Sequence, residues 1–431
     1  MTSTECAGHP SPDWMGDDNW NPADETFRVR LRAEAMRRLS GLCIESGDLP
    51  DVETALASMA GLDPLFLLPA LLDLEAHAES ATTRDTAHVL LGAYNNHLPR
   101  SAGTSESVAG SSLPDEHPLD YDWRFADDTR GELADLLLRP DATPVLLLGC
   151  PTLAFDERVA NVSRILVDDN PGIPSITDRP QLTHLRRDLI EDPSCTAGYG
   201  AKTVVGDPPF YPDAMTAYAY AAAVGLRVDG QAHLVAPSSW ARPTAAADTA
   251  QFIIEAASYG LELTSHARDR ARYRTPKFEH MAYARAGYLG IPETWRTADV
   301  LTFTLITPCS VPAPSLESDR AQWHEVVAAG VRWRINPTRA AVSSAVDALG
   351  EERQLTTVSR RDPRRVGVNV FTDDNRAYRS SNPSLLTHVL HVTDDPDPLA
   401  ALARRLGAPL TTQQMRVARA TVHRIRASAG A

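Results

Sequence analysis

The sequence predicts an α/β protein in which a doubly wound, mostly parallel sheet follows a helical N-terminal domain and precedes a small α+β domain. Three observations predict this architecture. Residues 27–98 hold four segments with apolar residues at three- and four-residue spacing. Short apolar runs alternate with helical patterns over residues 118–311. Residues 312–431 combine strand-like runs with two closing helical patterns.

The N-terminal part divides into three predicted segments. Residues 1–26 are expected to form a disordered tail, because they are mostly polar and rich in acidic residues. The helical domain over 27–98 begins at a cap on Thr26. Residues 99–117 are rich in Ser, Gly and Pro and lack periodicity, which predicts a linker before the next domain.

The central α/β domain is predicted over residues 118–311. Helices are expected at 126–138, 213–225 and 244–259, and strands at 144–149, 163–169, 186–190, 202–206, 231–237, 261–267 and 300–306. In sheets of this kind ligands bind at the carboxyl ends of the strands. Functional residues are therefore sought directly after the predicted strands.

Composition excludes several classes of protein. The 431 residues carry a net charge of −14, which argues against a surface that follows nucleic acid throughout. No apolar run approaches the ~20 residues of a membrane span, and no secretory leader opens the chain, so we expect a cytoplasmic protein without membrane contact. The five cysteines are far apart and form no CxxC, so no metal site is expected.

The sharpest local signal is the run Gly206-Asp207-Pro208-Pro209-Phe210-Tyr211, directly after a predicted strand. Two consecutive prolines remove two backbone donors and hold the chain extended. Carbonyl groups and the Asp207 carboxylate can then accept hydrogen bonds from an amine and aim its lone pair at an electrophile. Phe210 offers an apolar face for a flat or aliphatic group. Without its position after a strand, the triplet Asp-Pro-Pro would indicate only a stiff loop.

Two further signals follow earlier strands. Gly149, Cys150 and Pro151 come after the first buried run, where a glycine lets the backbone approach a ligand. Asp168 and Asp169 end the second strand, where a carboxylate can accept hydrogen bonds from both hydroxyls of a ribose. Read alone, the second pair is equally consistent with a solvated turn.

Together, these three signals resemble the layout of Rossmann-like class I S-adenosylmethionine-dependent methyltransferases that carry an (N/D)PP(F/Y) motif. The opening of the domain, LDYDWRFADDT and later LLLGCPTLA, is similar to the N6-adenine-methyltransferase-like group. The catalytic domain of branched-chain polyamine synthase, an aminopropyltransferase, also resembles this layout and also follows a helical domain. The resemblance covers roughly residues 118–310.

The resemblance implies a cofactor, S-adenosylmethionine or its decarboxylated form, held by Gly149, Cys150, Pro151, Asp168 and Asp169. It also implies an amine site with the catalytic residues Asp207, Pro208, Pro209 and Phe210. The favoured reaction is methylation of an amine nitrogen on a small molecule or peptide. Three alternatives stay open: aminopropyl transfer, N6-adenine-type methylation of RNA or DNA, and a degenerate protein that only binds a nucleotide or a partner.

Substrate contacts are less well defined by the sequence. Tyr211 and Lys277 are the expected substrate-binding residues, Lys277 as part of a predicted recognition loop over 272–281. Tyr121, Trp123 and Phe125 could form an aromatic lid over the cofactor or simply pack at the entry to a helix. Structured RNA is a possible partner through the arginine-rich C-terminal third, and the closing helix at 412–427 allows a homodimer.

Overall fold

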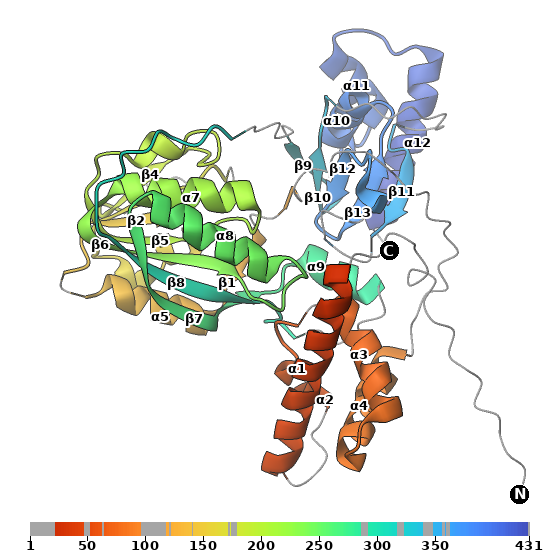
Figure 1. The fold of residues 1–431 in the computed structure, drawn as a ribbon. Helices are drawn as coiled ribbons and strands as arrows, with labels where there is room; N and C mark the ends of the chain where they lie inside the picture. Colours follow the sequence, from red (N-terminus) through yellow and green to blue (C-terminus); the bar gives the residue numbers. More distant parts are fainter. Residues whose placement is uncertain are drawn as a thin grey trace, which may run out of the picture.

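A computed structural model describes most of the chain (Figure 1). The described residues are 22–46, 52–62, 64–95, 118–119, 122–139, 141–170, 173, 179–285, 292–316, 323–338, 348–355, 358 and 363–429. The expected linker at 99–117, residues 1–21 of the expected tail, and Tyr121 of the expected aromatic lid lie outside them. No helix in these ranges is long and apolar enough to cross a membrane.

The N-terminal unit is a set of packed helices. They are α1 (Pro22–Ser46), α2 (Val52–Ser58), α3 (Pro64–His77) and α4 (Ala81–Asn95). The first helix begins inside the stretch expected to be a tail, with Pro22 in its first turn, where a missing N–H costs nothing. Leu31, Leu71 and Leu90 are buried in the core of this unit.

The central domain is built on an eight-stranded sheet. Its strands are β1 (Arg124–Phe125), β2 (Val145–Leu148), β3 (Arg164–Val167), β4 (Leu182–Leu185), β5 (Ala201–Gly206), β6 (Leu226–Pro237), β7 (Leu261–Arg274) and β8 (Thr297–Leu305). The spatial order is β1-β7-β8-β6-β5-β2-β3-β4. Strands β2 to β6 pair in parallel, whereas β8 runs antiparallel between β6 and β7.

This order confirms the predicted α/β fold class, a doubly wound and mostly parallel sheet. The strand order reverses at β2, because β3 and β4 lie on one side of it and β5 and β6 on the other. One predicted strand is wrong: residues 186–190 are not a strand, and the edge strand β4 is the preceding Leu182–Leu185. Its pairing with β3 brings in His184 and Leu185, which the apolar pattern had not included.

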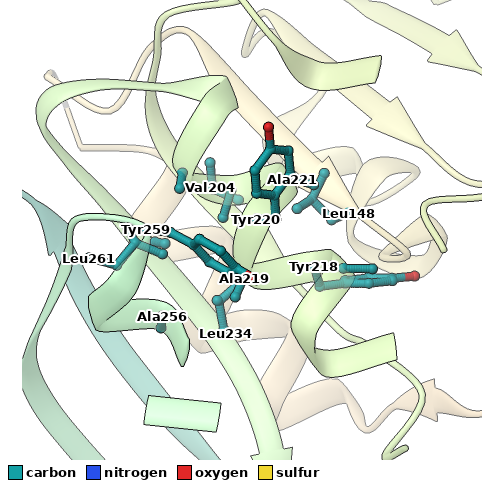
Figure 2. Close-up of a cluster of buried hydrophobic side chains, with 14 of the residues drawn as sticks. Leu148, Val204, Tyr218, Ala219, Tyr220, Ala221, Leu234, Ala256, Tyr259 and Leu261 are labelled. Carbon is teal, nitrogen blue, oxygen red and sulfur yellow. The ribbon is translucent and has the colours of Figure 1, made fainter. Parts of the chain in front are cut away.

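Helices cover both faces of this sheet. They are α5 (Asp127–Leu137), α6 (Pro151–Ala154), α7 (Pro212–Gly225) and α8 (Ala245–Ser258), with short 3-10 turns η3 (Glu157–Val159) and η4 (Pro193–Thr196). A further helix, α9 (Lys277–Arg285), follows β7. The cluster under α7 and α8 contains Leu148, Val204 and Tyr259. Figure 2 shows that the rings of Tyr218 and Tyr220, both on α7, point in different directions. A second cluster fills the opposite face under α5 and α6.

The predicted recognition loop over 272–281 is regular structure. Strand β7 continues to Arg274, and α9 starts at Lys277. Long-range pairing extends the strand, because Phe125 of β1 pairs with Tyr273 and Arg124 pairs with Arg274. A loop was expected here because the pairing partner, β1, lies far away in the sequence, at the start of the domain.

The C-terminal domain is a second sheet backed by helices. Its elements are β9 (His324–Ala328), β10 (Val331–Ile335), β11 (Glu351–Gln354), η5 (Pro363–Arg365), β12 (Val370–Thr372), β13 (Arg376–Arg379), α10 (Pro383–Val392), α11 (Pro398–Leu406) and α12 (Thr412–Ala429). The sheet is antiparallel in the order β11-β13-β12-β10-β9. Trp333, Leu390 and Ile425 are buried between the sheet and the helices.

The segment around α9 joins the three parts of the chain (Figure 1). Trp295 is buried among the N-terminal helices, and its Nε1 donates to the Leu62 carbonyl at 3.1 Å. On the other side, Arg285 at the end of α9 donates to the Asn375 carbonyl of the C-terminal domain. Both flanking units therefore pack next to the edge of the central sheet that carries β1 and β7.

Candidate active site

Three of the expected site residues lie side by side at the carboxyl ends of adjacent strands. Leu148, the last residue of β2, pairs with Val167 of β3 and with Gly206 of β5. Gly149, Asp168 and Asp207 each come one residue later, and backbone hydrogen bonds continue the ladder through them. Neighbouring strands are about 4.8 Å apart, so the Cα atoms of Asp168 and Asp207 lie about 10 Å from one another, with Gly149 between them. This is the point where the strand order reverses, the usual place for a ligand in such sheets.

Gly149 allows a close approach of backbone and side chain. Its φ of +64° lies in the left-handed region, where a side chain is strained. A Cβ at this position would lie 2.5 Å from the hydroxyl of Tyr218 and 3.0 Å from the Asp207 carbonyl. The turn after β2 can therefore close against β5 and α7 only with glycine.

The two residues that follow have different surroundings. Cys150 is buried, and its Sγ lies 3.3 Å from the Leu148 carbonyl, while burial raises the pKa of its thiol well above the ordinary value. The side chain thus packs inside the domain, and only the backbone of this residue borders the strand ends. Pro151 is the first residue of α6, where its fixed φ suits the helix start.

Asp168 and Asp169 differ in exposure: Asp168 is partly buried, whereas Asp169 is exposed. The Asp168 Oδ1 accepts the Asn170 N–H at 2.8 Å, and burial raises the pKa of Asp168 to about 6. The Asp169 side chain is exposed. His184 fixes the turn further, with Nε2 at 2.9 Å from the Asp168 carbonyl oxygen.

The hydrogen-bond partner of the Asp207 side chain is a neutral group. Its Oδ1 accepts a hydrogen bond from the hydroxyl of Tyr273 on β7. Burial raises the pKa of Asp207 to about 7, although the Tyr273 hydrogen bond and the charge of Arg124 both act to lower it. A carboxyl group with such a pKa can gain or lose a proton near neutral pH.

Aromatic rings surround this pair. The Tyr273 ring contacts Trp123, Phe125 and Phe210, with centroids 6.0, 5.2 and 6.2 Å away. Trp123 and Phe210 are partly exposed and lie edge-to-face with the Tyr273 ring, so they border it with apolar surface. We call these four rings the aromatic wall. Phe125 and Trp123 thus belong to the packing around Asp207.

An ion pair lies next to the aromatic wall, because one of its members contacts the Trp123 ring. The Arg296 guanidinium lies 4.7 Å from the centroid of the Trp123 ring and forms an ion pair with the fully buried Glu279. Tyr283 donates its hydroxyl to Glu279 at 2.7 Å. Arg296 directly follows Trp295, which is buried among the N-terminal helices, so adjacent residues contact the aromatic wall and the N-terminal unit.

Sequence reasoning missed Tyr273 as a site residue. The signal was present, because Ala271 and Tyr273 alternate with the charged Arg272 and Arg274, which is the pattern of a half-buried strand. The stretch was interpreted instead as a charged loop.

Both expected substrate contacts, Tyr211 and Lys277, have partners within the chain. The Tyr211 side chain packs against the core cluster under α7, and its N–H donates to the Pro209 carbonyl at 2.7 Å. Lys277 is exposed, with Nζ 3.5 Å from the Asp373 carboxylate of the C-terminal domain. Their assignment as substrate contacts stays a prediction.

No protein-family model matches the chain, and no curated protein matches its sequence. Among solved structures it is similar to a branched-chain polyamine synthase from Thermus thermophilus in complex with N4-aminopropylspermidine and 5'-methylthioadenosine, with 16% identity, 67% of this chain and 97% of that chain covered, and a TM-score of 0.42. It is also similar to a TehB-like S-adenosylmethionine-dependent methyltransferase from Corynebacterium glutamicum, with 15% identity, 42% and 89% covered, and a TM-score of 0.28. A 16S rRNA N2 G1207 methyltransferase from T. thermophilus matches at 14% identity, 52% and 51% covered, and a TM-score of 0.28.

Proposed function

We propose that the protein transfers an alkyl group, most simply methyl, from S-adenosylmethionine to an amine nitrogen of a small molecule or peptide. The observation that carries the proposal is the alignment of Gly149, Asp168 and Asp207 at the switch point of the sheet. One enclosed carboxylate lies on each side of the glycine turn, so a ligand between them meets two different anionic groups.

The residues after β2 and β3 fit the cofactor. Asp168 uses Oδ1 within its own turn, and its Oδ2 accepts no hydrogen bond from the described residues, so it can accept from ribose hydroxyls. Gly149, Cys150 and Pro151 would line the cofactor with backbone atoms, while Asp169 lies at the exposed rim. S-adenosylmethionine, or its decarboxylated form, supplies an electrophilic carbon bonded to a sulfonium sulfur.

Asp207 and the prolines would hold the acceptor. The Pro209 carbonyl is occupied by the Tyr211 N–H, which leaves the Pro208 carbonyl as the backbone acceptor for an amine. Asp207 accepts a second N–H and takes up the proton that the nitrogen loses as its new C–N bond forms. The electron pair of the broken S–C bond stays on sulfur, so charge and atoms balance. Phe210 lies beside the amine as an apolar surface.

The charge of the chain supports a cationic acceptor. At −14 the protein attracts ammonium groups and repels polyanions. We therefore favour a small amine, a polyamine or a peptide amine over nucleic acid. Structured RNA is the next candidate, because residues 398–429 contain six arginines and no acidic residue. Nucleic-acid binding near physiological salt that weakens steeply with log salt would reverse this ranking.

Calorimetry with three ligands separates the possible functions. A methyltransferase binds S-adenosylmethionine and S-adenosylhomocysteine, whereas an aminopropyltransferase prefers decarboxylated S-adenosylmethionine. A protein that only binds a partner takes none of the three, and that result would refute the proposal.

Replacing Asp207 by Ala tests the acceptor site. The variant should lose turnover while it keeps most of its affinity for the cofactor, since Asp168 and the glycine turn are untouched. Unchanged turnover would show that Asp207 does not have the assigned role.

A further inference from the structure

Tyr273 meets Asp207 from a different part of the sheet. Asp207 follows β5, whereas Tyr273 is on β7, and two strands, β6 and β8, lie between β5 and β7 in the sheet. The Tyr273 hydroxyl nevertheless donates to Oδ1 of Asp207. Oδ2 of Asp207 accepts no hydrogen bond from the described part of the chain. The two oxygens of one carboxylate therefore have different partners.

The Tyr273 ring is fixed on several sides. Tyr273 pairs with Phe125 of β1, and the backbone N–H of Tyr273 donates to the Arg296 carbonyl at 3.0 Å. The other rings of the aromatic wall contact it, and only 3% of the residue is exposed. The hydroxyl consequently has a fixed position from which to orient the carboxylate.

We propose that Tyr273 is a positioning residue for Asp207, whose hydroxyl binds Oδ1 and thereby directs Oδ2 toward the acceptor nitrogen. This assignment rests on the proposed function, since it concerns the acceptor side of the same site. Tyr273 does not touch the reacting atoms; it acts through Asp207.

A neutral donor suits an amine acceptor better than a cation would. A guanidinium at the position of the Tyr273 hydroxyl would neutralise Asp207 and repel an ammonium group. The phenol stabilises the carboxylate and leaves its negative charge available to the substrate. Tyr273 itself is buried, and a hydrogen bond is electrostatically stronger in such surroundings than in water.

Other groups also influence Asp207 and have to be held constant in a test. They are Arg124 on β1, Asp168 after β3, Cys150 after β2 and Tyr218 on α7. Arg124 lowers the pKa of Asp207 and Asp168 raises it. None of them changes when only the Tyr273 hydroxyl is removed.

The pH dependence of turnover in Tyr273→Phe tests the proposal on the full chain. The hydroxyl donates to the ionised carboxylate, so its loss should raise the pKa of Asp207. The acid limb of kcat should move up by about one pH unit, which corresponds to an about tenfold loss at pH 6.5 and near recovery at pH 9.5. Tyr220→Phe removes another buried tyrosine hydroxyl, away from Asp207, and should leave the limb in place.

A direct titration decides the role even without turnover. In protein labelled with 13C at the aspartate carboxyls, the Asp207 signal is assigned as the one lost in Asp207→Asn. Its pKa should rise in Tyr273→Phe, and an unchanged pKa overturns the proposal. Absence of any transfer by the unmodified chain would instead refute the proposed function, while the titration still tests Tyr273.

A fluorinated tyrosine at position 273 covers the case in which Tyr273→Phe does not fold. The ring and hydroxyl are kept, but the more acidic phenol is a stronger donor, so the pKa of Asp207 should fall. A rise or no change would contradict the assigned hydrogen bond.

Discussion

Asp156 and Asp207 are both enclosed aspartates of the central domain, but their partners differ in charge. Asp156 lies between Arg158 and Arg130, each with a nitrogen 2.7 Å from its Oδ2. The hydrogen bonds from Arg158 hold the pKa of Asp156 at about 2. Asp207 receives a neutral tyrosine hydroxyl, and burial raises its pKa to about 7.

The difference distinguishes a carboxylate with a structural role from the carboxylate that we propose takes part in the reaction. Asp156 stays ionised at any physiological pH and also accepts the Arg158 N–H at the start of η3, so it fixes a turn. Asp207 can exchange a proton near neutral pH at the edge where ligands bind. The perturbation is therefore informative through its direction and position, since desolvation raises the pKa of both carboxyl groups and only Asp156 has cationic partners that outweigh it.

The largest expected effect is on turnover. Asp207→Asn keeps an oxygen that accepts a hydrogen bond but cannot take up a proton, so kcat should fall by about 10³-fold. The matched variant Asp156→Asn should keep kcat within about twofold, measured with the same donor and acceptor at saturating concentrations. An equal loss in both variants would mean that the Asp207 effect is only structural.

The second effect is on stability and has an unusual sign. The folded pKa of Asp207, about 7, lies above the unfolded value of 3.8, so its stability contribution is lost as the pH rises from about 4 to 7. Asp207→Asn should therefore be more stable than the unmodified protein at pH 8, by about 3 kcal/mol after allowing for partial exposure. At pH 4 the two should unfold alike in urea. A variant less stable at pH 8 would contradict this.

Asp156→Asn should show the opposite sign and a smaller size. The folded pKa of about 2 lies below the unfolded value of 3.8, so the ion pairs stabilise the protein above pH 4 and this contribution is lost as the pH falls toward 2. At pH 7 the variant should lose about 2 kcal/mol of unfolding free energy, measured by urea denaturation. A loss that does not shrink between pH 4 and pH 2 would point to a cause other than charge.

The smallest effect concerns cofactor affinity. Asp168, with a pKa of about 6, is intermediate between the two aspartates. If its ionised form binds the ribose, affinity for S-adenosylmethionine should fall as the pH drops below about 6. Asp168→Ala should bind about tenfold more weakly at pH 8 and lose this pH dependence, measured by calorimetry. Asp135→Ala is the control, because that side chain on α5 is exposed and belongs to neither the cofactor side nor the acceptor side of the site, so the affinity should change little.

Local patterns in the sequence determined much of this picture. The apolar runs that end at Leu148, Val167 and Gly206 are continuous, which predicts strands buried on both faces and pairing in parallel. Parallel strands present their carboxyl ends at one edge, so Gly149, Asp168 and Asp207 could be expected to lie together. The helices α7 and α8 were predicted for the same reason, since their apolar spacing is local.

Only the tertiary structure decided what surrounds Asp207. Tyr273 is 66 residues further along the chain, and its contact depends on the antiparallel insertion of β8 between β6 and β7. Strand β1, which extends β7 past Arg272, lies about 150 residues earlier in the sequence. Such pairings are set by packing of the whole sheet and leave little trace in local periodicity. The same chain segment could thus be mistaken for a loop, although it carries the donor that orients the carboxylate.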